Sequence, residues 1–207
     1  MKLAGEDLRK VSEETLAHYD RRAADFWKGT RGHDVSQNIG TLLGHIQSAA
    51  PFTILDFGCG PGRDLAVFSK MGHVAIGLEG SEQFAAMARE FSGCEVWRQD
   101  FLALDLPAGR FDGVFANASL FHVPAQELPR VLGELHATLK AGGVLFSSNP
   151  RGTNEEGWNK GRYGAYHDLE AWRGFMKEAG FAELEHYYRP EGLPIDQRPW
   201  LASAWRR

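Results

Sequence analysis

Cysteine is scarce in this 207-residue chain, and its scarcity limits the chemistry that the protein can carry. The two cysteines present, Cys59 and Cys94, fit neither a disulfide framework nor a metal site. No cluster of His, Cys, Asp or Glu residues has the spacing of metal ligands, so no metal is expected. These absences predict a reduced, cytoplasmic setting.

Long hydrophobic runs and an excess of positive charge are also missing. No apolar run approaches the ~18 residues needed to span a bilayer, and residues 1–8 are too polar for a signal peptide. The formal net charge is −4, whereas proteins that bind nucleic-acid backbones usually carry a basic face. We therefore expect neither a membrane nor a nucleic acid as partner. The sequence does not define the oligomeric state.

What is present is enough apolar material for a sizeable core, since 43% of the residues are hydrophobic and 12% aromatic. We predict that residues 1–207 form one domain with four parts. These are a helical N-terminal cap with a break near residues 29–32, a cofactor-binding core, a lid loop without regular structure, and a last helix followed by an antiparallel hairpin. They cover residues 1–50, 51–149, 150–167 and 168–207.

Strands and helices alternate from residue 51 onward, which predicts right-handed βαβ units and a parallel sheet. Two strands near residues 182–188 and 200–205 have no helix between them and must pair antiparallel. The predicted fold class is therefore α/β, with a doubly wound, Rossmann-like sheet that is mostly parallel and ends in an antiparallel hairpin. Apolar stripes predict the helices of this core near residues 63–71, 81–91, 127–140 and 168–179.

The most informative motif is the segment Ile54–Asp64, a short apolar strand followed by an acid, a glycine-dense turn and the start of a helix. Gly58 and Gly60 permit a sharp turn and a close approach of a ligand to the backbone. The free N–H groups of the helix that begins near Arg63 point at the same place. This layout predicts a nucleotide-type cofactor site at the carboxyl end of the first strand.

Two kinds of cofactor suit such a turn. The dinucleotide fingerprint G-x-G-x-x-G needs a third glycine where this chain has Arg63, which weakens the assignment to an NAD(P) oxidoreductase. The segment resembles motif I, D/E-x-G-x-G-x-G, of the class I S-adenosylmethionine-dependent methyltransferases, with Asp56 as its acid. An acid near the turn suits a cationic sulfonium better than it suits phosphates.

Later landmarks follow the order of that family. Glu79–Ser81 is similar to its D/E-x-S pattern at the end of the second strand, and Asp100–Phe101 is similar to the acid and aromatic that follow the third. Residues 111–122 resemble motif IV. Residues 139–149 resemble the L-K-P-G-G turn and the fifth strand, with Ala141 in place of the proline.

The resemblance implies a set of contacts to S-adenosyl-L-methionine. Glu79 is expected to accept hydrogen bonds from the ribose hydroxyls, which its position about 20 residues past the glycine turn also predicts. Asp100 is expected to accept from the adenine amino group, and the end of motif IV to face the sulfonium. The implied cofactor contacts are Tyr19, Asp56, Gly58, Cys59, Gly60, Glu79, Gly80, Ser81, Asp100, Phe101 and Asn117.

The acceptor side rests on weaker signals. Residues 19–27 resemble the Y-D-x-x-A-x-x-F/Y segment of small-molecule methyltransferases of the ubiquinone/menaquinone and tellurite-resistance type, in which the tyrosine covers the cofactor. The alternative is that Tyr19 and Phe26 belong to the buried stripe of a helix. His122 is either a general base or a lining residue of the acceptor pocket. The candidate substrate contacts are His33, Phe121, His122, Arg151, Trp158 and Tyr163.

Together these patterns predict transfer of a methyl group from S-adenosyl-L-methionine to a small-molecule acceptor by in-line displacement. A protein or tRNA methyltransferase is the alternative among enzymes. A non-catalytic, cofactor-binding partner subunit is the alternative from another class. The N/D-P-P-Y signature of adenine-amino methyltransferases is absent at Asn117–Leu120. Neither the acceptor nor the methylated atom is defined by the sequence.

Overall fold

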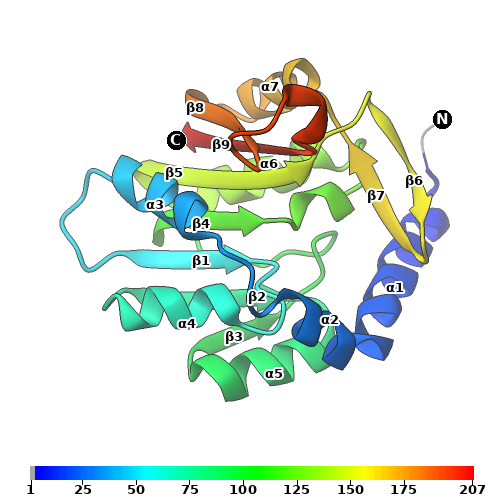
Figure 1. Ribbon diagram of the computed structural model, residues 1–207, viewed down its shortest axis with the longest axis horizontal. Helices are drawn as coiled ribbons and strands as arrows, with labels where there is room; N and C mark the ends of the chain where they lie inside the picture. The colour runs from blue at the N-terminus through cyan, green and yellow to red at the C-terminus, as the bar shows by residue number, and fades with distance from the viewer. Residues whose placement is uncertain (1–2) are drawn as a thin grey trace.

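The computed structural model describes residues 3–207, and its main feature in that range is a seven-stranded mixed sheet with the order β3-β2-β1-β4-β5-β9-β8 (Figure 1). The strands from β3 to β5 are parallel, whereas β9 runs antiparallel to both of its neighbours. This arrangement confirms the predicted fold class. The strands are β1 (Thr53–Phe57), β2 (Val74–Glu79), β3 (Glu95–Arg98), β4 (Phe111–Asn117), β5 (Leu139–Pro150), β8 (Ala182–Arg189) and β9 (Trp200–Arg206).

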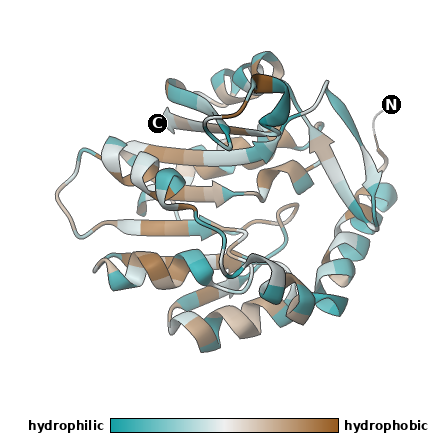
Figure 2. Cartoon of the chain, in the orientation of Figure 1, coloured by the Kyte–Doolittle hydropathy of each residue, from teal (hydrophilic) through white to brown (hydrophobic). Residues whose placement is uncertain are grey.

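Helices cover both faces of the sheet, because alternate residues of each strand point to opposite sides. In β1, Ile54 joins the cluster packed under α3, α4 and α5, whereas Leu55 joins the cluster under α6 and α7. Figure 2 shows hydrophobic residues concentrated in the central strands. The helices are α1 (Gly5–Arg21), α2 (Ala23–Thr30), α3 (Ser36–His45), α4 (Arg63–Lys70), α5 (Glu82–Ser92), α6 (Leu128–Thr138) and α7 (Leu169–Glu178), with short 3₁₀ turns η1 (Leu120–His122) and η2 (Ile195–Gln197).

The N-terminal part differs from the expected pair of helices, because the first one divides at Arg22 into α1 and α2. This bend brings the rings of Tyr19 and Phe26 to 5.7 Å between centroids, and both rings also contact Phe84. Seven residues along a straight helix are ~10 Å apart. The bend therefore brings these two rings closer together than a single straight helix would hold their backbones.

The segment 150–167, predicted as a loop without regular structure, instead contains the antiparallel hairpin of β6 (Glu155–Asn159) and β7 (Arg162–Tyr166). The two residues between the strands, Lys160 and Gly161, both have positive φ, which is typical of a tight hairpin turn. Most of β6 is exposed on both faces, so it lacks the alternation that predicts a strand. The hairpin packs against α1, beyond the carboxyl ends of β1 and β4 (Figure 1).

None of the helices in the described residues 3–207 combines the length and the hydrophobicity that a membrane span requires. No group of three or more His, Cys, Asp or Glu side chains in the same range is arranged to hold a metal ion.

Candidate functional site

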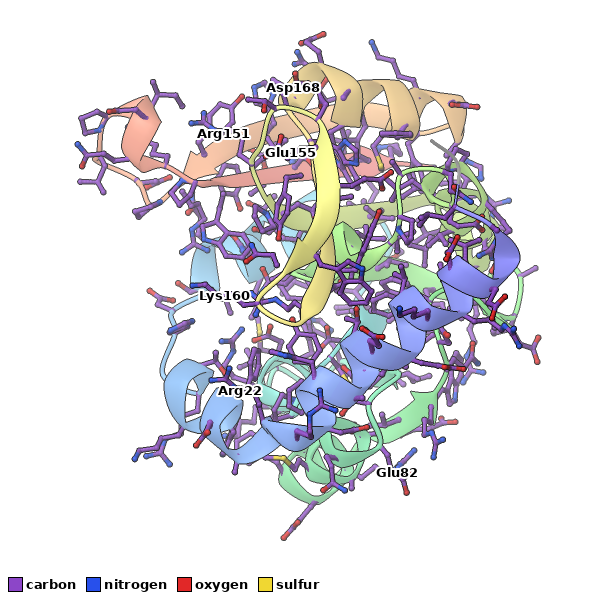
Figure 3. All side chains as sticks on the ribbon, turned by 90° about the vertical axis from the view of Figure 1, so that its right-hand side faces the viewer. Arg22, Glu82, Arg151, Glu155, Lys160 and Asp168 are labelled. Carbon is purple, nitrogen blue, oxygen red and sulfur yellow. The ribbon has the colours of Figure 1, made fainter. Side chains whose placement is uncertain are left out.

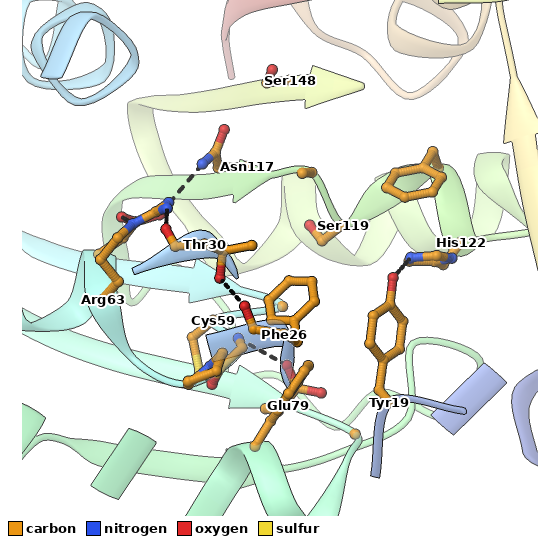
Figure 4. Close-up of a pocket in the computed structure, with 18 of the residues that line it drawn as sticks. Tyr19, Phe26, Thr30, Cys59, Arg63, Glu79, Asn117, Ser119, His122 and Ser148 are labelled. Atoms are coloured by element: carbon orange, nitrogen blue, oxygen red, sulfur yellow. Dashed lines mark hydrogen bonds and ion pairs between the residues drawn. The ribbon is translucent and has the colours of Figure 1, made fainter. Parts of the chain in front are cut away.

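A cavity of about 820 Å³ lies at the carboxyl ends of β1, β2 and β4. In open α/β sheets a ligand binds where the strand order reverses, and here that point is between β1 and β4. The cavity walls come from α1, α2, the glycine turn after β1, the ends of β2 and β4, and β7 (Figure 4). The volume falls within the range of small-molecule sites, roughly 300–1,000 Å³.

The turn after β1 places bare backbone against this cavity. Gly60 has a φ of +52°, and no atom lies within 4 Å of the position that a Cβ would take there. Gly58 has a φ of +77°, and a Cβ there would lie 2.4 Å from the Cβ of Ser119. Gly58 is therefore required by packing, whereas Gly60 leaves the main chain open to a ligand. Cys59 lies between them and also lines the cavity.

Glu79 lies at the end of β2 and projects into the cavity wall next to Gly60 (Figure 4). Its carboxylate accepts hydrogen bonds of 2.9 Å from the backbone N–H groups of Gly60 and Ser81. Burial raises the pKa of Glu79 to about 7, although these backbone donors act in the opposite direction. A buried acceptor with spare lone pairs therefore faces the cavity. Gly80 lines the wall beside it.

Asp100 and Phe101, which follow β3, also line the cavity. The Asp100 carboxylate accepts from the hydroxyl of Ser12 in α1 and, at 2.8 Å, from the backbone N–H of Leu102. The ring of Phe101 stacks on Phe57 with 4.2 Å between centroids. The wall near Asp100 is thus tied to α1, which the sequence pattern did not predict.

Two of the residues expected to contact the cofactor do not line the cavity. Ser81 is buried and caps α5: its hydroxyl oxygen accepts from the Phe84 backbone N–H at 3.1 Å and donates to Asp20 at 2.6 Å. Asp56 is 2% exposed, and its Oδ2 has no hydrogen-bond partner within the described residues. Burial and the nearby Asp64 raise the pKa of Asp56. The motif acid thus lies beneath the glycine turn rather than on its open side.

A directed chain of hydrogen bonds joins Tyr19, His122 and the backbone of Tyr163. Figure 4 shows the bond between Tyr19 and His122. Nδ1 of His122 lies 2.6 Å from the carbonyl oxygen of Tyr163. Because a carbonyl only accepts, Nδ1 must carry the proton and donate. Nε2 of His122 then has only a lone pair, and it accepts from the Tyr19 hydroxyl at 2.7 Å. The Tyr19 oxygen therefore presents only lone pairs to the cavity.

The electrostatics of this chain do not favour a base at His122. Burial lowers the pKa of His122 to about 4, and the lone pair of Nε2 is already engaged by Tyr19. Burial also raises the pKa of Tyr19 to about 12, so its hydroxyl stays protonated. The geometry supports the lining alternative for His122, in which it orients Tyr19. The cavity position of Tyr19 is compatible with a cofactor cover and with membership of the aromatic cluster.

A polar network links the glycine turn to the N-terminal helices. Arg63 donates to Asp64 with two bonds of 2.7 and 2.9 Å and to the carbonyl of Thr30 at 2.9 Å. The side chain of Asn117, at the end of β4, accepts from Asn38 of α3 at 3.0 Å. This network positions α2 and α3 over the cavity.

The predicted acceptor residues divide into two groups. His33, Phe121 and His122 line the cavity, whereas Arg151, Trp158 and Tyr163 do not. Trp158 is 47% exposed on β6, and the Tyr163 side chain is buried on the other side of β7. The residues that line the wall without having been predicted include Val11, Ser12, Thr15, Trp27, Phe84, Arg189 and Trp200, and Arg162 of β7 lines it as well. Successive side chains of a strand point to opposite faces. In β7, Arg162 therefore faces the cavity whereas the next residue, Tyr163, points away from it.

Comparisons with known proteins agree with this geometry. A family model described as a methyltransferase domain matches residues 54–143. Trans-aconitate 2-methyltransferase of Azoarcus sp. (strain BH72) is 32% identical over 116 residues, which cover 55% of this chain and 45% of that protein. The 18S rRNA (guanine-N(7))-methyltransferase of Schizosaccharomyces pombe is 28% identical over 149 residues, which cover 64% of this chain and 54% of that protein. The chain thus spans about half the length of these curated relatives.

A solved structure shows the same fold along the whole chain. The 1,6-didemethyltoxoflavin-N1-methyltransferase of Burkholderia thailandensis, with bound 1,6-didemethyltoxoflavin and S-adenosylhomocysteine, has a TM-score of 0.78 at 20% identity. The match covers 100% of this chain and 92% of that one. The family match begins at Ile54 in the motif strand and ends after the turn that leads into the core of β5. Residues 54–143 therefore match a methyltransferase domain, and the chain has the fold of the class I S-adenosylmethionine-dependent methyltransferases.

Proposed function

We propose that the protein transfers a methyl group from S-adenosylmethionine to a small-molecule acceptor. The observation that carries the proposal is the placement of Glu79 beside Gly60, a buried carboxylate next to bare backbone at the switch point of the sheet. A carboxylate in this position can accept both hydroxyls of a ribose. The open turn leaves space for the methionine part of the cofactor, so the residues present fit this group.

Different residues of the wall bind different parts of the cofactor. Glu79 holds the ribose, Asp100 and Phe101 border the adenine, and Gly60 lets the cofactor approach the main chain. When bound, S-adenosylmethionine supplies a methyl group already activated by its sulfonium. The remaining task of the protein is to align the acceptor with that methyl group and to exclude water. α1, α2 and β7 cover the site for this purpose.

The proposal of a small acceptor rests on the cavity and on charge. Helices and the hairpin wall off about 820 Å³, which suits a cofactor with a small partner. One relative is named for trans-aconitate and another for 18S rRNA. Similarity to these relatives therefore does not distinguish a small-molecule acceptor from an RNA acceptor. An RNA partner would be favoured by a basic track for its phosphates, whereas this chain carries a net charge of −4. Both cysteines are free, which suits action in the cytoplasm.

Calorimetry tests the choice of cofactor. We expect S-adenosylmethionine and S-adenosylhomocysteine to bind and NAD(H) not to bind, because the third glycine of the dinucleotide fingerprint is replaced by Arg63. Tight binding of NADH without any response to S-adenosylhomocysteine would overturn the proposal. A screen of a metabolite library with methyl-labelled cofactor then tests transfer. Binding without transfer to any metabolite, protein or RNA would favour the partner-subunit alternative.

The affinity for S-adenosylhomocysteine is expected to rise from about pH 6 to about pH 8, because ionised Glu79 is the better acceptor and its pKa is about 7. Ligand binding should therefore release protons in this range, which calorimetry in buffers of different ionisation enthalpy measures. In the free protein, the effect of pH on folding stability has the opposite sign. The raised pKa of Glu79 contributes stability that is fully present below pH 4.5, the ordinary pKa, and that is lost as the pH rises through about 7. A dissociation constant that is independent of pH would contradict the expected role of Glu79.

A further inference from the structure

Arg162 stands apart among the charged residues of the cavity wall. Within residues 3–207 its guanidinium makes no hydrogen bond or ion pair, and its Nε is buried without a partner. A buried donor without an acceptor destabilises the fold, and more so when it belongs to a charged group. The side chain therefore has unmet capacity for an acceptor atom that enters the cavity.

The other arginines of the wall are already engaged. Arg63 forms its two bonds to Asp64 and donates to a backbone carbonyl. Arg189 donates to Oδ1 of Asn38 at 2.8 Å and to the carbonyl of Asp34 at 3.1 Å. Both side chains hold structural elements together, so neither is available in the way that Arg162 is.

The acidic side chains of the wall are held by other donors and do not neutralise Arg162. These acids lie in the first turn of α4, at the end of β2, in the loop after β3, and before α3. The donors are the Ser36 amide for Asp34, Arg63 for Asp64, the Gly60 and Ser81 amides for Glu79, and Ser12 with the Leu102 amide for Asp100.

Hydrogen bonds to both backbone groups of the neighbouring Tyr163 fix the position of Arg162. The backbone N–H of Tyr163 donates to the Thr15 hydroxyl at 3.0 Å, and the carbonyl of Tyr163 accepts from His122. The guanidinium carbon lies 6.0 Å from the centroid of the Tyr19 ring. Burial and, to a lesser degree, the charge of Arg162 lower the pKa of His122 to about 4. The charge of Arg162 thus acts on Tyr19 and His122.

We propose that the methyl acceptor carries a carboxylate or phosphate group that binds Arg162, an inference that rests on the proposed methyl transfer. A guanidinium matches the oxygens of either anion with two parallel N–H···O bonds. The remainder of the acceptor is apolar, because aromatic side chains contribute much of the wall. They include Phe26, Trp27, Phe84, Phe121 and Trp200.

The test uses matched pairs of probes that differ in charge. Benzoate is compared with benzamide, and phenyl phosphate with phenol, by calorimetry on protein saturated with S-adenosylhomocysteine and again without it. We expect at least one anion to bind roughly tenfold tighter than its neutral partner. Arg162→Gln should abolish this preference, and Arg162→Lys should retain part of it. Lys160→Gln is the matched control, because it removes a charge from the turn of the same hairpin outside the cavity (Figure 3).

Three results would overturn the inference. The first is that neither anion binds tighter than its neutral partner, including the case in which no probe binds at about 10 mM. The second is that the preference survives in Arg162→Gln with its circular dichroism unchanged. The third is that Arg162→Gln weakens the binding of S-adenosylhomocysteine as much as Glu79→Gln does. That result would mean that the guanidinium binds the amino-acid carboxylate of the cofactor. Loss of the proposed function is distinguishable: wild-type protein would then fail to bind S-adenosylhomocysteine while the preference for anions at Arg162 persists.

Discussion

Replacing Glu79 with glutamine is expected to weaken S-adenosylhomocysteine binding by roughly one to two orders of magnitude, because hydrogen bonds to a charged acceptor contribute ~1.5–3 kcal/mol. The carboxylate is buried, so water cannot take its place as hydrogen-bond acceptor for the ribose. The fold should survive, since glutamine has nearly the same shape and its amide oxygen can still accept from a backbone N–H. Calorimetry at about pH 8, where the wild-type carboxyl is mostly ionised, measures the difference.

A matched control for this substitution is Glu82→Gln. Glu82 lies three residues further along, is exposed on α5 and pairs with Arg98 at 3.3 Å (Figure 3). The substitution Glu82→Gln should leave the dissociation constant for S-adenosylhomocysteine unchanged, because exposed ion pairs contribute little to stability. If Glu79→Gln keeps the wild-type affinity as well, the ribose is held by another residue.

Replacing His122 with glutamine is expected to lower the turnover of the true acceptor by roughly ten- to hundredfold at every pH, because the change misplaces Tyr19 rather than removing a base. Nε2 of His122 is already bonded to Tyr19, and the pKa of about 4 makes the imidazole a weak base. Tyr19→Phe should produce a loss of the same order, since it removes the oxygen that His122 orients. The measurement is kcat as a function of pH, with an acceptor identified by the labelled-cofactor screen.

The base alternative makes a different prediction for the same variant. It requires a steep loss of rate that alkaline pH partly restores, because the acceptor then ionises unaided. Observation of that recovery would reject the positioning role. Nitrogen chemical shifts of His122 give a check that needs no acceptor: the geometry requires the proton on Nδ1, and a proton on Nε2 would contradict the directed chain to Tyr163. His45→Gln, on α3 and outside the cavity, is the control for loss of an imidazole.

The features that the sequence predicted depend on neighbouring residues. The turn at Gly58 and Gly60 requires backbone conformations that glycine adopts readily, so its location is visible in a local motif. The alternation of strands and helices and the acid at Glu79 follow from periodicity and spacing along one segment. The antiparallel end of the sheet follows from the absence of a helix between two strands.

The features that were missed depend on residues far apart in the chain. Ser81 has the position expected for a cofactor contact, but its hydroxyl is already used to cap α5 and to hold Asp20 of α1. The hairpin at 155–166 was missed because exposed β6 lacks an apolar alternation. Its packing on α1 then decided that Arg162, rather than Arg151 or Trp158, lines the wall.

The fold class and the cavity wall formed by the glycine turn and Glu79 could be predicted from the sequence, because a glycine turn and a strand-end acid are local requirements of the backbone and of hydrogen bonding. The wall around Tyr19, His122 and Arg162 depends on tertiary contacts. His122 and Tyr19 are separated by 103 residues, and their hydrogen bond exists only because β7 and α1 pack together over the strand ends. The backbone carbonyl of Tyr163 in β7 sets the proton on His122, and the packing of β7 on α1 places Arg162 at the cavity wall. Both contacts join segments that are far apart in the chain.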